Sequence, residues 1–578
     1  MAVAPSPRTR PAAAPEWEWC CPSCPGVPPA WPPTCHPEPV NEPVLVPAQP
    51  AWGSRGAVVS PQRLASQAGL AILRAGGGAV DAAIATNAAL AVVASHSCGL
   101  GGDAFWLIWD PPAKRLQALN GSGRSAAAAT LEAARATAGD DCHLPLRGPW
   151  SVTVPGAVRS WGDAHARFGR LPWAELLGPA IELADGFPAS PGWIAAVERA
   201  ATIFGSEGDW AQVFRPAGRP WGRGEQVVIT GLAGTLRRLA AEGPDVLYRG
   251  DLAACAATYL TQRGSPLRAP DLADHRSIWA EPIATDYRGL TSYSHPPNSC
   301  GPLALETLAV LGRFPAPPTS AFGPQGVTDP TWVHLGLETS RLVLADRDRY
   351  LTDPEAMAAG ALETLLSPAH ADALAGRIDA RQAAPAPPLD APRGGGTIYL
   401  ATADRWGGVV SLIESNYAGF GSGLADPQTG IAYQNRGAFF SLDPASPNVL
   451  APNKRTWHTL TPGMLFRDGR PWVVHGSMGG EIQPQVFAQL VSDLVDGGLD
   501  VATAVAAPRW AADVAEHFGP PSLTRLEPRF VPAVAEGLRA RGHEVTFGPP
   551  FDSAMGHAHA IEIVPEEGAP DGPPRAFA

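Results

Sequence analysis

The sequence predicts a mixed α+β protein, because helical and strand patterns occupy different stretches of the chain. Residues 127–391 are largely helical in pattern, with clear amphipathic runs at 171–184 and 333–344. From residue 397 onward, short apolar runs separated by turn residues predict strands. At 578 residues the chain exceeds the roughly 250–300 residues at which one hydrophobic core stops growing. We therefore expect either two domains or one large layered domain.

Composition and charge exclude several classes of protein. Hydrophobic residues make up 45% of the chain and charged residues 17%, as in ordinary globular proteins. No uninterrupted apolar stretch of about 18 residues occurs, so the sequence predicts no membrane-spanning helix. The net charge of −12 argues against a nucleic acid partner, because binding to phosphates depends on an excess of Lys and Arg.

Residues 1–50 are predicted to be a disordered, proline-rich leader. They lack the roughly 7–15-residue apolar core of a secretory signal, so a cytoplasmic location is the default expectation. The Cys-X-X-Cys spacing in this stretch leaves a zinc site open as an alternative, with the candidate ligands Cys21, Cys24, Cys35 and His36. The cysteines beyond the leader are scattered and are expected to be reduced thiols: Cys98, Cys142, Cys255 and Cys300.

The globular pattern begins with an apolar run at 56–60 and a helical spacing at 62–74. After a glycine stop, the Ala-rich run at 79–94 has side chains small enough for close packing against a neighbouring helix. A glycine turn at 99–102 precedes an apolar strand. This turn lacks the Lys-Ser/Thr pair and the following helix of a phosphate loop, so we attribute its glycines to positive φ angles and close backbone approach.

A linker and a hairpin follow the helical middle of the chain. The Ala-, Pro- and Arg-rich composition of 380–393 predicts an exposed linker that suits backbone cleavage. Residues 397–403 and 408–415 predict two strands around the turn 404–407. The remaining elements are expected as strands at 430–435, 462–467 and 471–476, and as helices at 485–496 and 501–506.

Thr397 stands directly after three glycines, 394–396. A threonine hydroxyl becomes a useful nucleophile when a nearby base accepts its proton, and the α-amine of an amino-terminal threonine is such a base. That amine exists only if the bond after Gly396 is cut. Taken alone, a threonine after glycines is usually just the start of a strand, so the local pattern leaves both interpretations open.

Several motifs between about residues 56 and 563 occur in a specific order: 64–66 with 77–83, 99–103, 397–404, 452–455, 479–480 and 507–509. Together they resemble the γ-glutamyltransferase (γ-glutamyltranspeptidase) family of N-terminal-nucleophile hydrolases. The resemblance implies a four-layer αββα sandwich, made as a precursor that cuts itself into a large subunit (51–396) and a small subunit (397–578). It also implies acyl-enzyme chemistry on a small-molecule amide without metal or organic cofactor, and subunit pairs that could associate as dimers.

The resemblance assigns catalytic roles residue by residue. Thr397 corresponds to the nucleophile, and Gly396 to the residue before the cleaved bond. Ser415 corresponds to a second hydroxyl residue that positions the nucleophile. Gly479 and Gly480 correspond to the pair whose backbone N–H groups form the oxyanion hole. Without the resemblance, this glycine pair would be interpreted as a tight turn after a strand.

The substrate-binding positions depart from the family pattern. Ser122 stands where the family has a glutamate-binding arginine, which leaves Arg124 as the nearest substitute. Phe439 replaces the aspartate that holds the substrate's α-amino group, and a hydrophobic ring cannot form that salt bridge. His458 and Thr459 replace two serines that help to hold the α-carboxylate. These changes imply that amino-acid recognition has shifted.

Residues 415–417 and 419–423 resemble the branch of the family that includes oxamate amidohydrolase and certain cephalosporin acylases. Asn416 and Tyr417 therefore join the candidate substrate-binding residues, and Arg436 would supply a cation for a terminal carboxylate. A purely structural role for Arg436 is the alternative. We expect an enzyme that cleaves a small amide through a Thr397 acyl-enzyme, with hydrolysis preferred over transfer of the acyl group. One alternative is an amidohydrolase of oxamate or glutaryl type with no γ-glutamyl activity. The alternative from another class is an unprocessed, non-catalytic binding protein.

Two further groups are weaker candidates for chemistry. His557 and His559 would share one face of a strand and could hold a metal ion. His96 lies close to Cys98, which suggests a Cys-His nucleophile, but a buried structural role is favoured there.

Overall fold

The computed structural model describes residues 50–138, 143–385, 396–514, 522–564 and 575–577, all of which belong to one compact unit. The predicted leader lies outside the described residues except for Pro50, and the candidate zinc ligands Cys21, Cys24, Cys35 and His36 lie outside with it. Residues 386–393 of the predicted linker, and Gly394 and Gly395 after it, also lie outside the described residues. No described helix is long and apolar enough to cross a membrane.

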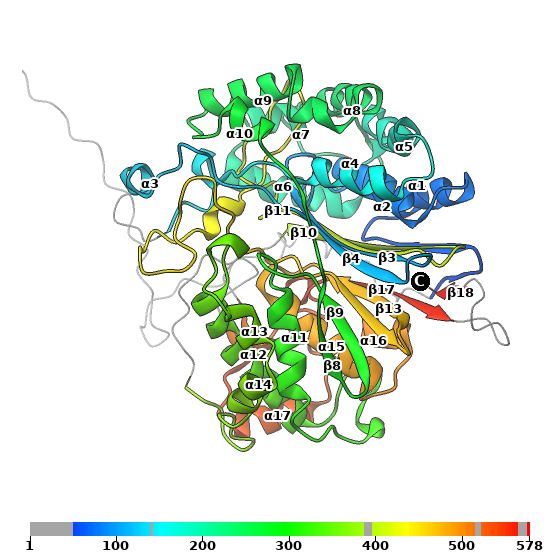
Figure 1. Cartoon of the computed structure of the whole chain (residues 1–578), viewed down its shortest axis with the longest axis vertical. Coiled ribbons are helices and arrows are strands. Elements are labelled where there is room, and N and C mark those ends of the chain that lie inside the picture. Colours follow the sequence, from blue (N-terminus) through cyan, green and yellow to red (C-terminus); the bar gives the residue numbers. More distant parts are fainter. Residues whose placement is uncertain (1–49, 139–142, 386–395, 515–521, 565–574, 578) are drawn as a thin grey trace, which may run out of the picture. The chain divides into compact units, whose positions relative to one another are not determined.

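Two antiparallel sheets form the centre of the fold (Figure 1). The six-stranded sheet has the order β2 (Gly56–Val59), β10 (Gly396–Asp404), β11 (Val409–Tyr417), β3 (Asp103–Asp110), β4 (Arg115–Gly121) and β7 (Ile278–Ala280). The seven-stranded sheet has the order β1 (Trp52–Gly53), β18 (Arg575–Phe577), β17 (Ala558–Val564), β13 (Arg470–Ser477), β12 (Gly463–Arg467), β9 (Leu290–Ser294) and β8 (Ile283–Tyr287).

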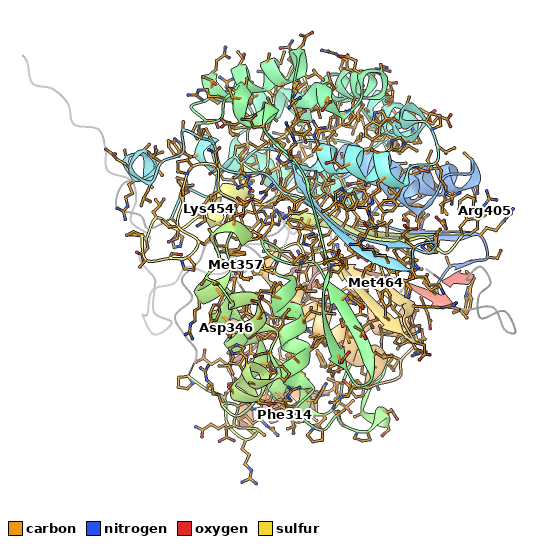
Figure 2. All side chains as sticks on the ribbon, in the orientation of Figure 1. Phe314, Asp346, Met357, Arg405, Lys454 and Met464 are labelled. Atoms are coloured by element: carbon orange, nitrogen blue, oxygen red, sulfur yellow. The ribbon has the colours of Figure 1, made fainter. Side chains whose placement is uncertain are left out.

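The inner faces of the two sheets pack against each other through one apolar layer. From the six-stranded sheet this layer takes Tyr399, Ala401 and Ile413, and from the other it takes Met464 and Val474. Met464 is labelled in the middle of the molecule in Figure 2. Neighbours along β10 point the other way, and both of its faces are buried. This explains why the strand is almost continuously apolar rather than alternating.

Helices cover the outer face of each sheet. Those beside the six-stranded sheet are α1 (Arg63–Arg74), α2 (Ala79–Val93), α4 (Ala157–Phe168), α5 (Trp173–Asp185), α6 (Pro191–Phe204), α7 (Asp209–Phe214), α8 (Thr230–Glu242), α9 (Asp251–Gln262) and α10 (Ala269–Ala273), with α3 (Leu131–Ala138) further out. Those beside the seven-stranded sheet are α11 (Gly301–Leu311), α12 (Pro330–Tyr350), α13 (Ala361–Leu365), α14 (Pro368–Ala375), α15 (Gln483–Val495), α16 (Val501–Ala506) and α17 (Pro532–Ala540). The four layers confirm the αββα sandwich.

The Ala-rich helix α2 packs closely against a neighbouring helix, as its small side chains predict. Every residue of this helix is buried, and α1 crosses it closely. A Cβ atom placed on Gly69 of α1 would lie 2.1 Å from Oγ1 of Thr86 on α2, so only glycine allows this approach. Small side chains on both helices thus bring the helical layer close to the sheet.

Two sequence predictions need correction. Residues 430–435 do not form a strand, because only isolated bridges occur there, and the backbone turns at Gly430 with a φ of 69°. The predicted helical middle also contains strands: β7 to β9, and the small pair β5 (Phe187–Pro188) and β6 (Gln226–Val227). A further small sheet joins β14 (Trp510–Val514), β15 (Ser522–Leu526) and β16 (Val545–Phe547).

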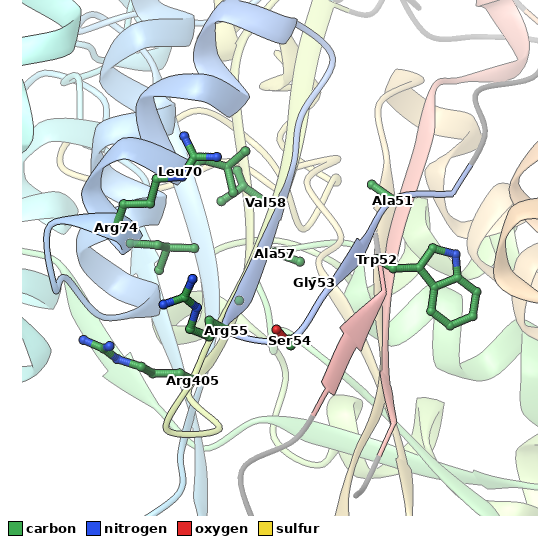
Figure 3. Close-up of a pocket in the computed structure, with 12 residues that line it drawn as sticks. Ala51, Trp52, Gly53, Ser54, Arg55, Ala57, Val58, Leu70, Arg74 and Arg405 are labelled. Atoms are coloured by element: carbon green, nitrogen blue, oxygen red, sulfur yellow. The ribbon is translucent and has the colours of Figure 1, made fainter.

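A cavity of about 470 Å³ lies at the far end of β10, where Arg55, Arg74 and Arg405 are among its lining residues (Figure 3). Arg405 directly follows the last residue of the strand, whereas Thr397 is near the first. At roughly 3.3 Å per residue, about 25 Å separates the two ends. This cavity is therefore distinct from the surroundings of Thr397.

Asp404 fixes the end of β10 to the helical layer. One carboxylate oxygen accepts hydrogen bonds from the N–H groups of Trp406 (2.8 Å) and Gly408 (2.9 Å), which shapes the hairpin turn. The other accepts from the N–H of Ala79 at 2.8 Å, at the start of α2. The side chain is buried, so these donors depend on it.

We predict that Asp404→Ala lowers the free energy of unfolding by roughly 2–4 kcal/mol, because it leaves buried N–H donors without acceptors. Urea unfolding followed by tryptophan fluorescence measures the change. Arg405→Ala, an exposed neighbour in the same turn, is the matched control and should change stability by less than about 1 kcal/mol. Equal stability of the two variants would contradict the prediction.

Candidate active site

A bulge in the strand pairing sets the position of Thr397. Gly396 pairs with Tyr417 and Ile398 pairs with Glu414, so two residues of β11 lie opposite the single residue Thr397 of β10. Bulges of this kind redirect side chains and are common beside active sites. A Cβ atom on residue 396 would lie 3.1 Å from the carbonyl oxygen of Tyr417, so the strand begins with a glycine in a crowded place.

The hydroxyl of Ser415 contacts both the hydroxyl of Thr397 and the carbonyl oxygen of the residue before it. Oγ1 of Thr397 donates a hydrogen bond to Oγ of Ser415 at 3.1 Å. Ser415 in turn donates to the carbonyl oxygen of Gly396 at 2.7 Å. All three residues are buried. The hydroxyl of Thr397 and the carbonyl of the bond before it therefore meet at one serine.

Arg436 reaches this group from the short 3₁₀ helix η5 (Arg436–Phe439). Its guanidinium donates to Oγ of Ser415 at 3.2 Å and to Oγ1 of Thr459 at 3.1 Å. The side chain is almost completely buried, and burial lowers its pKa to about 10, which leaves it charged at neutral pH. None of the ion pairs among the described residues includes Arg436, and its Nε atom is buried without a hydrogen-bond partner.

An aromatic cluster forms one side of the arginine. The guanidinium lies 4.7 Å from the ring centre of Tyr417 and 5.0 Å from that of Phe439. Phe439 packs between Tyr417 and Trp457, with ring centres 4.3 and 3.9 Å apart. Tyr417 adopts a φ of 72°, an uncommon value for a bulky residue, at the end of β11. Phe439 thus forms an apolar wall beside the guanidinium of Arg436.

Behind Arg436 lies a buried polar pair, Asp103 and His458. Nε2 of His458 is 3.3 Å from a carboxylate oxygen of Asp103, but without hydrogen-bond geometry. Burial, together with the charge of Arg436, lowers the pKa of His458 well below its usual value, so this imidazole is neutral. Burial raises the pKa of Asp103 to about 7, although Arg436 and the N–H groups of Gly123 and Gly156 act in the opposite direction.

Gly479 and Gly480 form the turn between β13 and the helical segment made of η6 (Gly480–Ile482) and α15. Their φ angles of 143° and 58° suit glycine. Neither N–H donates a hydrogen bond to a described residue. Glu481 directly follows the turn and forms an ion pair with the buried Arg347, which fixes this part of the backbone. Two free N–H groups at the start of a helical segment are suited to an oxyanion.

The glycine turn 99–102 packs against the end of β11, close to Asn416. A Cβ atom on Gly102 would lie 2.8 Å from Oδ1 of Asn416 and 2.9 Å from the carbonyl oxygen of Ser415. These distances confirm the close approach predicted from the sequence, but not the positive φ angles. The amide of Asn416 is fully buried without a hydrogen-bond partner and faces this turn.

Arg124 belongs to a different group of charges. Its guanidinium pairs with Asp353 at 3.2 Å and with Glu355 at 2.6 Å, and it donates to the carbonyl oxygen of Asn453. None of these partners contacts Thr397, Ser415 or Arg436 through a hydrogen bond. The guanidinium of Arg124 thus already has carboxylate partners, and no hydrogen bond joins it to Thr397, Ser415 or Arg436.

The surroundings of the weaker candidates do not favour the chemistry suggested for them. Burial raises the pKa of the Cys98 thiol far above its usual value and lowers that of His96 to about 4, so this pair has no tendency to form a thiolate and imidazolium. His96 instead packs against Trp193 and Phe420. His557 is exposed and His559 is half-buried, and among the described residues the histidine–carboxylate groups whose ligand atoms lie close together are elsewhere.

Sequence reasoning missed several residues that shape this site. Asp103, Gln434, Trp457 and Arg347 gave no separate signal, although Asp103 ends the glycine motif 99–103 and Trp457 follows the motif 452–455 closely. Gln434 donates to Asp103 at 3.0 Å and to Thr153 at 2.7 Å. A charged residue placed directly before an apolar strand was the one available clue to a buried role for Asp103.

The αββα sandwich, with the candidate residues at the start of a central strand, is the architecture of the N-terminal-nucleophile hydrolases. A model of the gamma-glutamyltranspeptidase family matches residues 65–576. The chain is 39% identical over 521 residues to the glutathione hydrolase-like YwrD proenzyme of Bacillus subtilis. The aligned region covers 89% of this chain and 96% of that protein. It is 38% identical over 530 residues to the oxamate amidohydrolase proenzyme of Klebsiella pneumoniae, covering 90% and 97% of the two proteins.

Among solved structures, the cephalosporin acylase from Bacillus halodurans matches with a TM-score of 0.83 and 38% sequence identity. The match covers 94% of this chain and 97% of that one. The chain therefore belongs to the gamma-glutamyltranspeptidase family, and its relatives include acylases and an oxamate amidohydrolase.

The raised pKa of Asp103 predicts a pH-dependent stability. An unfolded aspartate has a pKa near 3.9, so between about pH 4 and pH 7 the folded state keeps a proton that the unfolded state has lost. The contribution of Asp103 to the free energy of unfolding therefore falls as the pH rises from about 4 to 7, and above that range it stays constant. We predict that the unfolding midpoint of the wild type falls relative to that of Asp103→Asn between pH 4 and 7.

Thermal unfolding at a series of pH values measures this difference. Asp110→Asn, at the other end of β3, is the control for a neutralised aspartate on the same strand. Parallel pH profiles of the wild type and Asp103→Asn would show that Asp103 is ionised throughout, against the prediction.

Proposed function

We propose that this chain is an autoprocessed amide hydrolase whose nucleophile is Thr397 and whose substrates carry a carboxylate on a small acyl group. The observation that carries the proposal is the state of Arg436. This buried cation donates to two hydroxyls beside Thr397 and has no carboxylate partner in an ion pair among the described residues. A buried charge without a counter-ion is costly, so an anion from outside the chain fits this position.

Processing would begin with the hydroxyl of Thr397. Its oxygen attacks the carbonyl carbon of Gly396 while Ser415 donates a hydrogen bond to the carbonyl oxygen, an interaction that strengthens as negative charge develops there. The C–N bond breaks, the nitrogen takes the hydroxyl proton, and the acyl group moves to Oγ1 as an ester. Water then hydrolyses the ester. The products are a large subunit ending at Gly396 and a small subunit, 397–578, that starts with a free threonine amine.

Turnover would use the same hydroxyl with a different base. The new α-amine accepts the proton of Oγ1 as the oxygen attacks the substrate's amide carbonyl. The N–H groups of Gly479 and Gly480 stabilise the oxyanion of the tetrahedral intermediate. The amine product leaves with the proton, and water releases the acyl group as an acid. This cycle requires no metal or organic cofactor.

Substrate choice would depend on Arg436 and its aromatic neighbours. A carboxylate near the amide could pair with the guanidinium, with Thr459, Tyr417 and His458 close by. An α-ammonium group would instead face Phe439 and the cation itself, which disfavours γ-glutamyl compounds. The Klebsiella relative is named for oxamate, whose carboxylate adjoins its amide, and this supports the proposal. The carboxylates of Asp353 and Glu355 already pair with Arg124, so the proposed mode of substrate binding does not use Arg124.

Hydrolysis is preferred over transfer to an amine acceptor, and the names of the relatives as hydrolases and proenzymes support both hydrolysis and processing. The role of Asn416 in substrate binding, the cytoplasmic location and the association of subunit pairs into dimers stay predictions from the sequence. The competing candidate is an unprocessed binding protein that uses the same buried cation for an anionic ligand.

Denaturing electrophoresis tests the processing step. The wild type should give two fragments that divide between Gly396 and Thr397, as amino-terminal sequencing of the smaller one would verify. Thr397→Ala should give one full-length band and lose turnover by a factor on the order of 10⁴ or more, because no hydroxyl remains. Thr397→Ser keeps the hydroxyl and should still cut. Processing or turnover in Thr397→Ala would mean that another residue is the nucleophile.

Substrate comparison tests the role of Arg436. Processed wild-type enzyme should show a higher kcat/KM for oxamate or a glutaryl anilide than for a γ-glutamyl anilide. Arg436→Met should lower kcat/KM for the carboxylate-bearing substrates by about a hundredfold, through loss of a charge-assisted pair, with a smaller effect on an uncharged acyl anilide. Arg124→Met is the matched control and should change each value less than about threefold. A preference for the γ-glutamyl compound would refute this assignment of substrate class.

A further inference from the structure

A second group of polar side chains lies in the helical layer beside the seven-stranded sheet. Glu306 is on α11, Asp346 on α12 and His370 on α14, so three helices contribute one residue each. Figure 2 labels Asp346 in this layer. Neither the proposed catalytic cycle nor the sequence analysis gives these residues a role.

The three side chains converge on one point. Nε2 of His370 lies 3.0 Å from Oε1 of Glu306 and 2.8 Å from Oδ2 of Asp346. One ligand atom from each residue lies within 4.8 Å of the others. Glu306 is completely buried, Asp346 is nearly so, and the side chain of His370 is 16% exposed, which leaves a path for a small ion.

One oxygen in this group has no partner. Oε2 of Glu306 is buried and accepts no hydrogen bond from the protein. Burial raises the pKa of Glu306 to about 8, so this carboxyl holds a proton at neutral pH, and a bound cation would take the place of that proton. A cation between the three residues would also bind the unpartnered oxygen.

We infer that Glu306, Asp346 and His370 form a binding site for a divalent transition-metal ion, with zinc as the best fit to their ligand set. One imidazole and two carboxylates are common zinc ligands, with a fourth position open to water. At metal–ligand distances of about 2.0–2.1 Å, tetrahedral ligands are about 3.3 Å apart. The observed separations of 3.0 and 2.8 Å need only a small outward movement to reach that value.

A second group of metal-ligand residues shows what an unsuitable site looks like. Nδ1 of His334 is 2.7 Å from Nε2 of His543, so these two nitrogens share one hydrogen bond. Arg341 donates to Glu338 at 2.7 Å in the same cluster. A guanidinium at this place repels a cation, and the ligand atoms already have partners. The chain thus offers an internal control for metal binding.

The inferred ion would hold together helices that reach the candidate active site. Cys300, directly before α11, donates its N–H to the carbonyl oxygen of His458. Arg347, next to Asp346 on α12, pairs with Glu481 beside the Gly479–Gly480 turn. Bound metal would therefore stabilise the position of both segments without touching substrate.

Metal titration of the full chain, after dialysis against a chelator, tests the inference. Isothermal titration with Zn²⁺ should show one equivalent bound per chain and a raised unfolding temperature. Asp346→Asn and Glu306→Gln should each weaken binding at least tenfold, whereas His334→Asn should leave it unchanged. A Cys21→Ser/Cys24→Ser variant separates this site from any zinc held by the leader, and it should also bind normally.

Binding of Co²⁺ to the unaltered protein provides a readout that does not depend on variants that fold poorly. A site with one imidazole and two carboxylates should give weak visible bands without the strong near-ultraviolet absorption of thiolate ligation. Failure of Zn²⁺ and Co²⁺ to bind at millimolar concentration would show that the group is an ion pair only. Binding that survives in Asp346→Asn but is lost in His334→Asn or the cysteine variant would also overturn the inference.

Discussion

The arrangement of the candidate site depends on the limited hydrogen-bonding capacity of one atom, Oγ of Ser415. This oxygen has one proton to give and two lone pairs, yet donors arrive from Thr397, Arg436 and the N–H of Tyr417. Its proton goes to the carbonyl of Gly396. Since three donors compete for two lone pairs, none of them is held as firmly as an isolated hydrogen bond would be. The hydroxyl of Thr397 is thus oriented but still free to give up this contact.

Close packing keeps these atoms in place without a network of ion pairs. The glycine turn 99–102 presses its backbone against the end of β11, and Glu414 accepts a hydrogen bond from the N–H of Gly99 at 2.9 Å. On the opposite side, Arg436 is pressed against Tyr417 and Phe439. Both contacts need particular residue sizes, glycine on one side and flat rings on the other. The guanidinium of Arg436 is thereby kept charged, buried and directed toward the hydroxyls of Ser415 and Thr459.

Part of the fold was predictable, because α1 has a clear helical period and the two hairpin strands are apolar runs on either side of a turn. Helix α1 was expected at 62–74 and lies at Arg63–Arg74, and the hairpin strands differ from their predicted bounds by two residues at most. The failures have physical reasons. Residues 430–435 have strand composition, but the turn at Gly430 leaves them only isolated bridges. The site was harder to predict, because burial of Asp103 and the pairing of Arg124 with Asp353 depend on residues hundreds of positions apart.

The strand order of both sheets has a consequence for any cut between Gly396 and Thr397. Strand β10 lies between β2 and β11, and β11 lies beside β3, so segments from before and after this bond alternate within one sheet. In the other sheet, β12 pairs with β9 and β18 pairs with β1 across the same division. The two pieces would be woven together, and neither could leave without unfolding its partner. Made separately, each would expose unpaired strand edges that favour aggregation. Synthesis as one polypeptide is then the route by which two such chains acquire a shared core.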